Sequence, residues 1–220
     1  MRRELRITED GSHTFYLPDM DENYHSTHGA IQESKHIFIE AGLKRINKSD
    51  ITIFEVGFGT GLNALLTLLE AEKLKININY FGIEKYPLSD AEYSNLNYAG
   101  LLGANCQKAF LELHSSAWET NQIIAPNFQL TKLQEDITTF TFEQMPFFDL
   151  VYFDAFAPNK QEGVWEKKIF RKIYERCNDE AILVTYCAKG SVRRDLQDVG
   201  FTVERIPGPP GKKEMLRGIK

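Results

Sequence analysis

One 15-residue stretch, 51–65 (ITIFEVGFGTGLNAL), constrains the fold of this chain more than any other. Its apolar run at 51–56 predicts a strand that is covered on both faces. A glycine-rich turn follows at 57–61, and leucines then recur at helical spacing from Leu62 onward. A strand, a glycine turn and a helix in this order predict an α/β fold that binds a small anionic or nucleoside ligand above the turn.

The spacing of the glycines narrows the ligand. Gly57, Gly59 and Gly61 form G-x-G-x-G, whereas the dinucleotide fingerprint G-x-G-x-x-G requires a glycine where Leu62 stands. This difference disfavours a nicotinamide oxidoreductase. Glycine tolerates positive φ and leaves the backbone bare, so a ligand can approach the turn closely. The alternative is a tight turn that binds nothing.

The next apolar run favours the interpretation that the glycine turn binds a ligand. Residues 76–84 (ININYFGIE) read as a second strand that ends in Glu84. A carboxylate at the tip of this strand can accept hydrogen bonds from both hydroxyls of a ribose. A solvated strand end is the alternative, but the glycine turn that precedes it favours ribose binding.

The rest of the chain alternates strands and helices, with no repeats. A helix is expected at 31–43, and an insertion with helical patterns at 91–101 and 106–118 occupies about 87–127. This βαβ order predicts a mostly parallel sheet with helices on both faces. The short connection at 207–211 implies a final hairpin and an antiparallel last strand. The remaining elements expected are strands at 128–133, 148–153, 181–186, 201–206 and 214–219, and helices at 164–176 and 190–199.

Length and composition bound the remaining possibilities. We expect one domain over residues 1–220, with an N-terminal extension and helix at 1–45 and the core at 46–220. No apolar segment is long enough to span a bilayer, so we expect a cytoplasmic protein that does not contact membranes. The three cysteines include no C-x-x-C pair, which favours buried thiols over a zinc site or a disulfide framework.

The net charge of −5 is unfavourable for a nucleic-acid enzyme, because phosphate contacts need local positive potential. The distribution of charge allows it, since basic residues are clustered. Each cluster alone is more often a solvated face. The clusters are Arg2, Arg3 and Arg6; Lys167, Lys168, Arg171 and Lys172; Arg193 and Arg194; and Lys212, Lys213, Arg217 and Lys220.

A second motif, DAFAP at 154–158, follows the fourth predicted strand. An enzyme that methylates an amine needs an acceptor that orients the N–H group and a surface that holds the attached ring. Asp154 can supply the acceptor, and Phe156 can stack on a base, a contact worth roughly 1–3 kcal/mol. The alternative is an Asp that caps the following turn, with Phe156 in the core.

Other polar groups are expected at the same edge of the sheet. Asp136 follows the third strand and is placed to accept from the amine of an adenine, although an N-cap role is nearly as plausible. Tyr24 and His25 precede the first helix and are expected to cover the cofactor or the substrate. His25 and His28 lack a third ligand at a convincing spacing, so no metal site is expected.

These motifs together are similar to a known family. The chain resembles the MnmC-like/MnmD tRNA methyltransferases, the stand-alone form of the methyltransferase domain of the tRNA 5-methylaminomethyl-2-thiouridine biosynthesis protein. The resemblance covers nearly the whole chain, and DAFAP and GKKEM are its most specific parts. The matching stretches are DGSHTFYLPDMDENYHSTHGAIQES at 10–34, EVGFGTGLN at 55–63, FGIEKYPL at 81–88, DLVYFDAFAPNKQEGVW at 149–165 and VRRDLQDVGFTVERIPGPPGKKEML at 192–216.

The resemblance implies a class I, Rossmann-like methyltransferase fold with a seven-stranded sheet, and S-adenosyl-L-methionine as cofactor. It implies that the substrate is the 5-aminomethyl group of a wobble uridine in the tRNA anticodon. Asp154, Phe156 and Tyr24 are then the catalytic candidates. The cofactor candidates are Glu55, Gly57, Phe58, Gly59, Gly61, Asn63, Glu84, Lys85, Asp136 and Asp154, and the substrate candidates are His25, Phe156, Pro158, Arg193, Lys212 and Lys213.

Two departures from the family pattern matter. The bifunctional relatives carry a flavin-dependent domain that produces the aminomethyl substrate, and these 220 residues contain none. We therefore expect a separate enzyme to supply the amine. The turn PGPPG at 207–211 is richer in proline than the usual family version, so the resemblance assigns no tRNA contact to it.

Two other functional classes fit the same motifs. A methyltransferase or aminopropyltransferase acting on a small amine would share the glycine turn and the ribose carboxylate. A non-enzymatic module that binds an adenosyl ligand or RNA would share them too. Insensitivity of the substrate to ribonuclease would indicate the first, and tight cofactor binding without methyl transfer would indicate the second.

Overall fold

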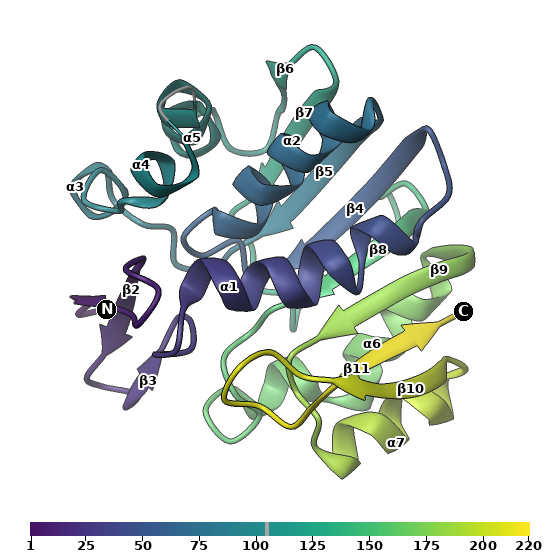
Figure 1. Cartoon of the computed structure of the whole chain (residues 1–220). Helices are drawn as coiled ribbons and strands as arrows, with labels where there is room; N and C mark the ends of the chain where they lie inside the picture. The colour runs from purple at the N-terminus through teal and green to yellow at the C-terminus, as the bar shows by residue number, and fades with distance from the viewer. Residues whose placement is uncertain (104–105) are drawn as a thin grey trace.

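The computed structural model describes residues 1–103 and 106–220. Most of the described chain forms a central sheet covered by helices, and a small separate sheet lies at the N-terminal end (Figure 1). The central strands are β4 Asp50–Val56, β5 Asn77–Ile83, β6 Asn121–Ala125, β7 Phe128–Leu133, β8 Phe148–Phe153, β9 Cys177–Thr185, β10 Thr202–Pro207 and β11 Glu214–Ile219.

Helices fill the connections between these strands. Those labelled η are short 3-10 or π-helical turns, and the others are α-helices. They are α1 Ala30–Ser34, η1 Lys35–Glu40, η2 Leu43–Arg45, α2 Leu62–Leu74, α3 Asp90–Tyr93, α4 Tyr98–Leu102, α5 Cys106–Ser115, η3 Glu162–Trp165, α6 Lys167–Glu175 and α7 Gly190–Val199.

Across the described residues the central sheet has eight strands in the order β10-β11-β9-β8-β4-β5-β7-β6. Strands β7, β5, β4, β8 and β9 run parallel, and β11 is antiparallel to both β9 and β10. The predicted α/β class, the mostly parallel sheet and the antiparallel last strand are confirmed. In the described part of the chain the sheet has one strand more than the seven expected, because β6 pairs antiparallel with β7 at the edge.

Strand β6 lies within the insertion at about 87–127, for which the sequence predicted helices. Its hydrophobic pattern is weak because an edge strand buries little, and Ile123 is 76% exposed. The insertion differs in a second way, because the expected helix at 91–101 is divided into α3 and α4. Between them Asn97 accepts from the backbone N–H of His13 and donates to the carbonyl of Gly11, so its side chain binds the N-terminal segment. Residues 104 and 105 of the insertion lie outside the described residues.

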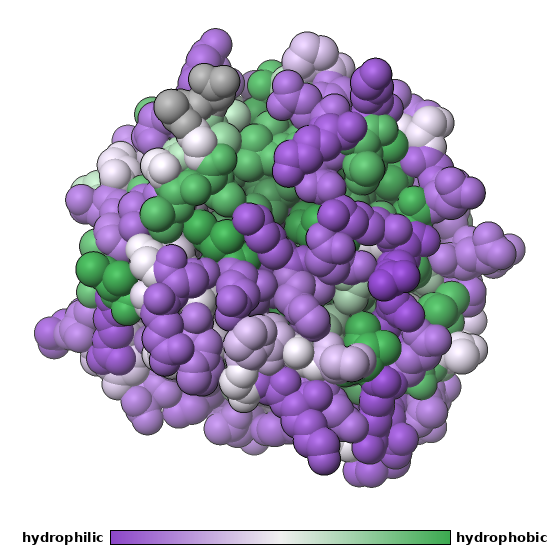
Figure 2. Space-filling model, viewed as in Figure 1, coloured by the Kyte–Doolittle hydropathy of each residue, from purple (hydrophilic) through white to green (hydrophobic). Residues whose placement is uncertain are grey.

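The two faces of the sheet have separate apolar cores. Side chains of η1, α2, α4 and α5 pack on one face, and side chains of α6 and α7 pack on the other. Strand β8 is buried along its whole length between the two, as expected for an apolar sequence interrupted only by Asp149. Figure 2 shows the face that carries α4 and α5, where apolar side chains gather amid polar surface; Leu101 there is 50% exposed.

The N-terminal extension, for which the sequence predicts irregular or hairpin structure over residues 1–30, forms a small sheet. Strands β1 Glu4–Ile7, β2 His13–Leu17 and β3 Glu22–Asn23 form an antiparallel sheet beside the start of α1 (Figure 1). The helix that follows runs through α1 and the wider turn η1 to Glu40, three residues short of its expected end. In the described residues no helix combines the length and the apolar character needed to cross a membrane.

Candidate active site

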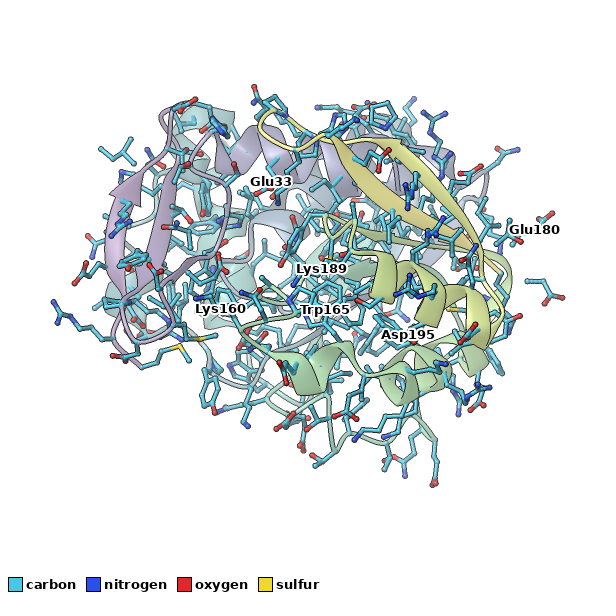
Figure 3. The ribbon with its side chains drawn as sticks, turned by 90° about the horizontal axis from the view of Figure 1, so that it is seen from below. Glu33, Lys160, Trp165, Glu180, Lys189 and Asp195 are labelled. Atoms are coloured by element: carbon cyan, nitrogen blue, oxygen red, sulfur yellow. The ribbon has the colours of Figure 1, made fainter. Side chains whose placement is uncertain are left out.

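A cavity of about 440 Å³ lies where β4, β5 and β8 end, within the size range of small-molecule sites. Segments from both ends of the chain complete its wall. Figure 3 shows Glu33 on the α1 helix in the upper part of the view, with Lys160 and Trp165 below it near the middle. The lining includes Met1, Tyr24, His25, Ser26, Glu33, Gly57, Phe58, Gly59, Thr60, Asn63, Glu84, Lys85, Asp136, Asp154, Phe156, Gln161, Tyr186 and Lys212.

The glycine turn joins β4 to α2 in a conformation that requires glycine. Gly57, Gly59 and Gly61 have φ values of 90°, 49° and 68°, all left-handed. A Cβ atom on Gly57 would lie 2.5 Å from the carbonyl oxygen of Asp154. Gly57 and Gly59 line the cavity, whereas a Cβ on Gly61 would lie 2.8 Å from Nε2 of His114, so Gly61 permits packing against α5.

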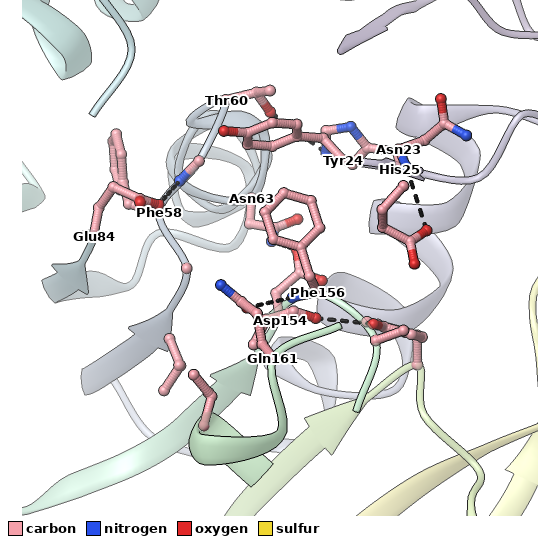
Figure 4. Close-up of a pocket in the computed structure, with 18 of the residues that line it drawn as sticks. Asn23, Tyr24, His25, Phe58, Thr60, Asn63, Glu84, Asp154, Phe156 and Gln161 are labelled. Carbon is pink, nitrogen blue, oxygen red and sulfur yellow. Dashed lines mark hydrogen bonds between the residues drawn. The ribbon is translucent and has the colours of Figure 1, made fainter. Parts of the chain in front are cut away.

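Glu84 follows β5 and binds the glycine turn. Its Oε2 accepts from the backbone N–H of Gly59 at 3.0 Å, and its Oε1 accepts from the N–H of Tyr86 at 2.8 Å (Figure 4). The side chain is therefore fixed at the cavity wall and is not a freely solvated strand end. Each carboxylate oxygen has a second lone pair available to a ligand.

Two carboxyl groups share one amide beneath the turn. The Nδ2 group of Asn63 donates to Glu55 and to Asp154, at 2.8 Å each, and the hydroxyl of Tyr80 donates to Glu55 at 2.9 Å. Burial raises the pKa of Glu55 well above its usual value, and burial raises the pKa of Asp154 to about 7. The Oδ1 atom of Asn63 is buried and has no partner among the described residues.

The DAFAP segment faces the cavity. The side chain of Asp154 is bound by Asn63 and does not cap the following turn. Phe156 is half-buried, and its ring meets that of Tyr24 edge to face with centroids 4.9 Å apart (Figure 4). Its backbone is held at both ends, because its N–H donates to Gln161 and its carbonyl accepts from the indole of Trp165. Phe156 is a wall of the cavity and not a core residue.

Asp136 lies at the far end of the cavity from Asp154 along the sheet edge. Its Oδ2 accepts from the ammonium of Lys85 at 2.7 Å, and its Oδ1 accepts from the N–H and hydroxyl of Thr138. Burial acts to raise its pKa, but the Lys85 and Thr138 hydrogen bonds prevail and hold the pKa at about 2. Residues 137–139 form a turn and not a helix, and Asp136 caps this turn. The alternative that Asp136 is the N-cap of a helix is therefore wrong.

Tyr24 and His25 cover the cavity from the N-terminal side. The hydroxyl of Tyr24 accepts from Nε of Arg3 at 2.9 Å, and burial raises its pKa to about 12. His25 lies between the hydroxyls of Thr14 and Thr60, at 3.1 and 3.4 Å from its ring nitrogens. Burial lowers the pKa of His25 to about 4, so the ring is neutral at physiological pH.

The sequence reasoning missed Glu33 and Tyr186. Lys212, which it did propose, donates to Oε1 of Glu33 at 2.7 Å and lies 4.0 Å from the centroid of the Tyr186 ring. A signal for Glu33 was present, because it lies one helical turn after Ala30 on the buried side of the helix. Its pairing with a residue 179 positions away left no trace in the sequence pattern.

Several predicted residues do not line the cavity. Glu55 lies behind Asn63, and Pro158, Arg193 and Lys213 are outside the wall, so their assignment to the substrate stays a prediction. Within residues 1–103 and 106–220, no group of three or more His, Cys, Asp or Glu side chains is arranged to hold a metal ion.

Comparisons with known proteins show the family and the fold of the chain. Residues 103–220 match the model of a family described as S-adenosyl-L-methionine-dependent methyltransferase. The bifunctional tRNA 5-methylaminomethyl-2-thiouridine biosynthesis protein MnmC of Cupriavidus necator is 32% identical over 215 residues, which cover 91% of this chain and 32% of the relative. The corresponding protein of Magnetococcus marinus is 30% identical over 94% of this chain and 32% of its own length. The chain thus spans about a third of the length of these relatives.

Solved structures show the same fold. The crystal structure of MNMC2 from Aquifex aeolicus superposes with a TM-score of 0.83 at 25% identity, over 99% of this chain and 69% of that one. Spermidine synthase from Thermotoga maritima superposes with a TM-score of 0.50 at 11% identity, over 100% of this chain and 71% of that one. The second likeness concerns the fold alone. The first extends the family match from the C-terminal half to the whole chain.

Proposed function

Because the chain belongs to the family of S-adenosyl-L-methionine-dependent methyltransferases, we propose that it methylates the amine of 5-aminomethyl-(2-thio)uridine at the tRNA wobble position. The product is 5-methylaminomethyl-(2-thio)uridine. The observation that carries the proposal is the position of Asp154, a carboxylate between the glycine turn and the Phe156–Tyr24 ring pair. The printed names of the relatives support the tRNA substrate.

The residues of the cavity fit S-adenosyl-L-methionine. This cofactor has an ammonium and a carboxylate on its methionine part, a ribose diol and an adenine. The orphaned Oδ1 of Asn63 is a buried acceptor that such an ammonium would satisfy. Gly57 and Gly59 line the same cavity with bare backbone, and a Cβ atom on them would press on the carbonyl of Asp154 and on the ring of Tyr24.

We assign the remaining cofactor contacts by position. Glu84 would accept from the ribose hydroxyls, and Asp136 would accept from the adenine amine while Lys85 holds it ionised. Phe58 contributes backbone, because its ring packs against Gly82. Glu55 acts through Asn63, which it orients from behind. When bound, the cofactor supplies a methyl group on a positively charged sulfur, which an amine lone pair can attack.

The protein's part in the reaction is to orient the amine and to remove its proton. An aminomethyl group is mostly protonated at neutral pH and has no free lone pair in that form. Asp154 is placed to receive a proton from the ammonium nitrogen, and a base with a pKa of about 7 suits that task. Phe156 and Tyr24 would hold the uracil ring, so that most of the rate enhancement is positioning.

The target amine must reach Asp154 inside the cavity, which a base within the anticodon stack cannot do. The wobble base would therefore be turned out of the stack before it enters. His25 and Lys212 line the cavity on the substrate side, and Pro158, Arg193 and Lys213 are proposed to contact the RNA outside it. We place the reaction in the cytoplasm, and a separate enzyme supplies the aminomethyl group.

The test is transfer of labelled methyl to tRNA from cells that lack this protein, followed by mass analysis of the nucleosides. We expect label in 5-methylaminomethyl-(2-thio)uridine only. Ribonuclease treatment of the tRNA before the assay should abolish transfer, and free small amines should not be methylated. Transfer to small amines with none to tRNA would replace the proposal by the small-molecule alternative.

A further inference from the structure

A primary ammonium already lies in the wall of the cavity, and it belongs to the protein. Lys212, in the turn between β10 and β11, points its Nζ at Oε1 of Glu33 over a distance of 2.7 Å. The same nitrogen lies 4.0 Å from the centroid of the Tyr186 ring, within the range of a cation–π contact. A carboxylate and an aromatic face are the two groups that protein sites use to bind an alkylammonium.

Glu33 is built to hold a cation. Its side chain is 9% exposed on α1, and its Oε2 accepts from the backbone N–H of Ser26 at 2.7 Å. A carboxylate this buried is costly unless a cation and hydrogen bonds compensate the lost water. The Lys212 side chain is 32% exposed, so the two partners are unequal: the carboxylate is fixed and the ammonium is near solvent.

The Glu33–Lys212 pair also lies near Asp154, the residue that we propose as the base. The hydroxyl of Tyr186 donates to the carbonyl of Ala155 at 2.8 Å, directly after Asp154. The charges of Glu33 and Lys212 both act on the ionisation of Asp154, which places them near its carboxyl group. An ammonium bound at Glu33 would therefore be a neighbour of Asp154.

We propose that Glu33 recognises the primary ammonium of the substrate, and that Lys212 occupies this place until the substrate displaces it. The inference rests on the proposed function, because it assigns the amine-recognition residue of that site. Because the substrate ammonium replaces the ammonium of Lys212, the buried negative charge of Glu33 is paired with a cation before and after the exchange. The arriving amine then lies against Tyr186 and beside Asp154, where its proton can be removed.

The displacement needs only a side-chain movement. Gly211 has a φ of 85°, and a Cβ atom there would collide with the ring of His28, so the turn is packed closely on the N-terminal segment. The backbone can stay in place while the four-carbon stem of Lys212 swings its ammonium toward solvent. Glu33 and Tyr186 are left facing the cavity.

The experiment measures binding without methyl transfer. An anticodon stem-loop carrying 5-aminomethyluridine is compared with one carrying 5-methyluridine, which lacks the amine. The ratio of the two dissociation constants reports recognition of the ammonium alone, and it is measured in the absence of S-adenosyl-L-methionine. The wild type should prefer the aminomethyl form by at least about tenfold, the effect of one good charged contact.

Variants of the two partners should change this ratio in opposite directions. Glu33→Gln should reduce the preference to within about twofold, whereas Lys212→Met should increase it by about tenfold, because the competing ammonium is gone. Lys212→Arg should keep the wild-type ratio, since it keeps a cation on Glu33. The matched control is the Lys44–Glu40 pair, which has the same 2.7 Å separation but does not line the cavity; Glu40→Gln and Lys44→Met should leave the ratio unchanged.

Two results would overturn the inference. One is a Glu33→Gln protein that folds and still prefers the aminomethyl stem-loop as the wild type does. The other is a Lys212→Met protein that binds both stem-loops more weakly by the same factor, which would make Lys212 a phosphate contact. Failure of the proposed function can be told apart from failure of this inference, because in the first case the wild type itself transfers no methyl group to tRNA.

Discussion

We propose that the chemistry of the site depends on Asp154, whose pKa is set by two opposing influences. Burial raises its pKa to about 7, while the amide of Asn63 stabilises the ionised form. A carboxylic acid with this pKa is partly protonated in neutral solution. Its ionisation should therefore be visible in both the rate and the stability of the protein.

The rate of methyl transfer should rise with pH through about pH 7, because only the ionised form of Asp154 can accept the proton of the amine. We expect Asp154→Ala to lower the single-turnover rate at saturating cofactor by a factor of about 10² or more, with a much smaller effect on cofactor affinity. Single-turnover assays and cofactor titrations across the pH range measure both. Near-wild-type turnover in this variant would remove Asp154 from the mechanism.

The free energy of unfolding should also depend on pH through Asp154, but it should fall with rising pH where the rate rises. The folded protein holds the Asp154 proton up to about pH 7 and the unfolded chain releases it near pH 4, so stability falls as the pH rises between these values. Asp154→Asn should therefore melt higher than the wild type at about pH 8, by about 2–4 °C for each kcal/mol recovered. Calorimetry at about pH 4 is the control, because there the difference should vanish. A difference between the wild type and Asp154→Asn that is the same at both pH values would contradict the raised pKa.

The glycine turn permits a clean test at a single position. Gly57→Ala places a methyl group 2.5 Å from a backbone oxygen at a left-handed φ, so it should cost about 2 kcal/mol or more in the free energy of unfolding. Gly100→Ala is the matched control, since nothing lies within 4 Å and the helix α4 should gain up to about 1 kcal/mol. Denaturant titration measures both, and equal effects would show that the turn is not constrained as described.

At the scale of elements, the N-terminal sheet is fastened to the site by Arg3. This side chain is 5% exposed and donates to Tyr24, to Glu92 on α3 and to the carbonyl of Tyr86. These contacts connect three segments around the cavity. The N-terminal sheet is therefore held against the wall of the cavity.

Arg3→Met should weaken cofactor binding by about tenfold and expose the N-terminal segment to proteolysis, because three segments lose a common donor. Arg2→Met is the control, as Arg2 is 72% exposed and pairs only with Glu4 among the described residues. Isothermal titration and timed proteolysis distinguish the two. A variant with wild-type affinity and wild-type cleavage would show that Tyr24 holds its position without Arg3.

The elements that the sequence predicted well are those whose signals are local. Strand β8 and helix α7 have the predicted bounds because one is an apolar run interrupted only by Asp149 and the other an amphipathic repeat ended by Gly200. Strand β6 and the break between α3 and α4 were missed, because pairing at an edge and a bond from Asn97 to a distant backbone depend on tertiary structure. The cavity residues that directly follow a strand, such as Glu84 and Asp154, could be predicted from the sequence. The Glu33–Lys212 pair could not, because its partners are 179 positions apart.

At the scale of the whole molecule, a chain with a net charge of −5 is proposed to bind RNA through a local set of cations. Binding of tRNA should weaken steeply with salt, and Arg193→Ala should reduce the slope of log affinity against log salt by about one. Arg45→Ala is the control, because Arg45 precedes β4 and so lies at the end of the strands away from the cavity. Fluorescence titrations at several salt concentrations measure the slopes. An unchanged slope in the Arg193 variant would confine the RNA contacts to the cavity.

The position of β11 has a consequence for how the chain matures on the ribosome. It is the last of the described strands to be synthesised, yet it is inserted between β9 and β10, which are made before it. Until it emerges, β9 presents an open edge and β10 has no partner in the sheet. The turn that carries Lys212 emerges at the same moment. Pairing of β11 therefore completes this side of the sheet and brings the turn of Lys212 to the cavity in one step. A chain in which β11 is not yet paired leaves the cavity open and the edges of β9 and β10 exposed to mispairing.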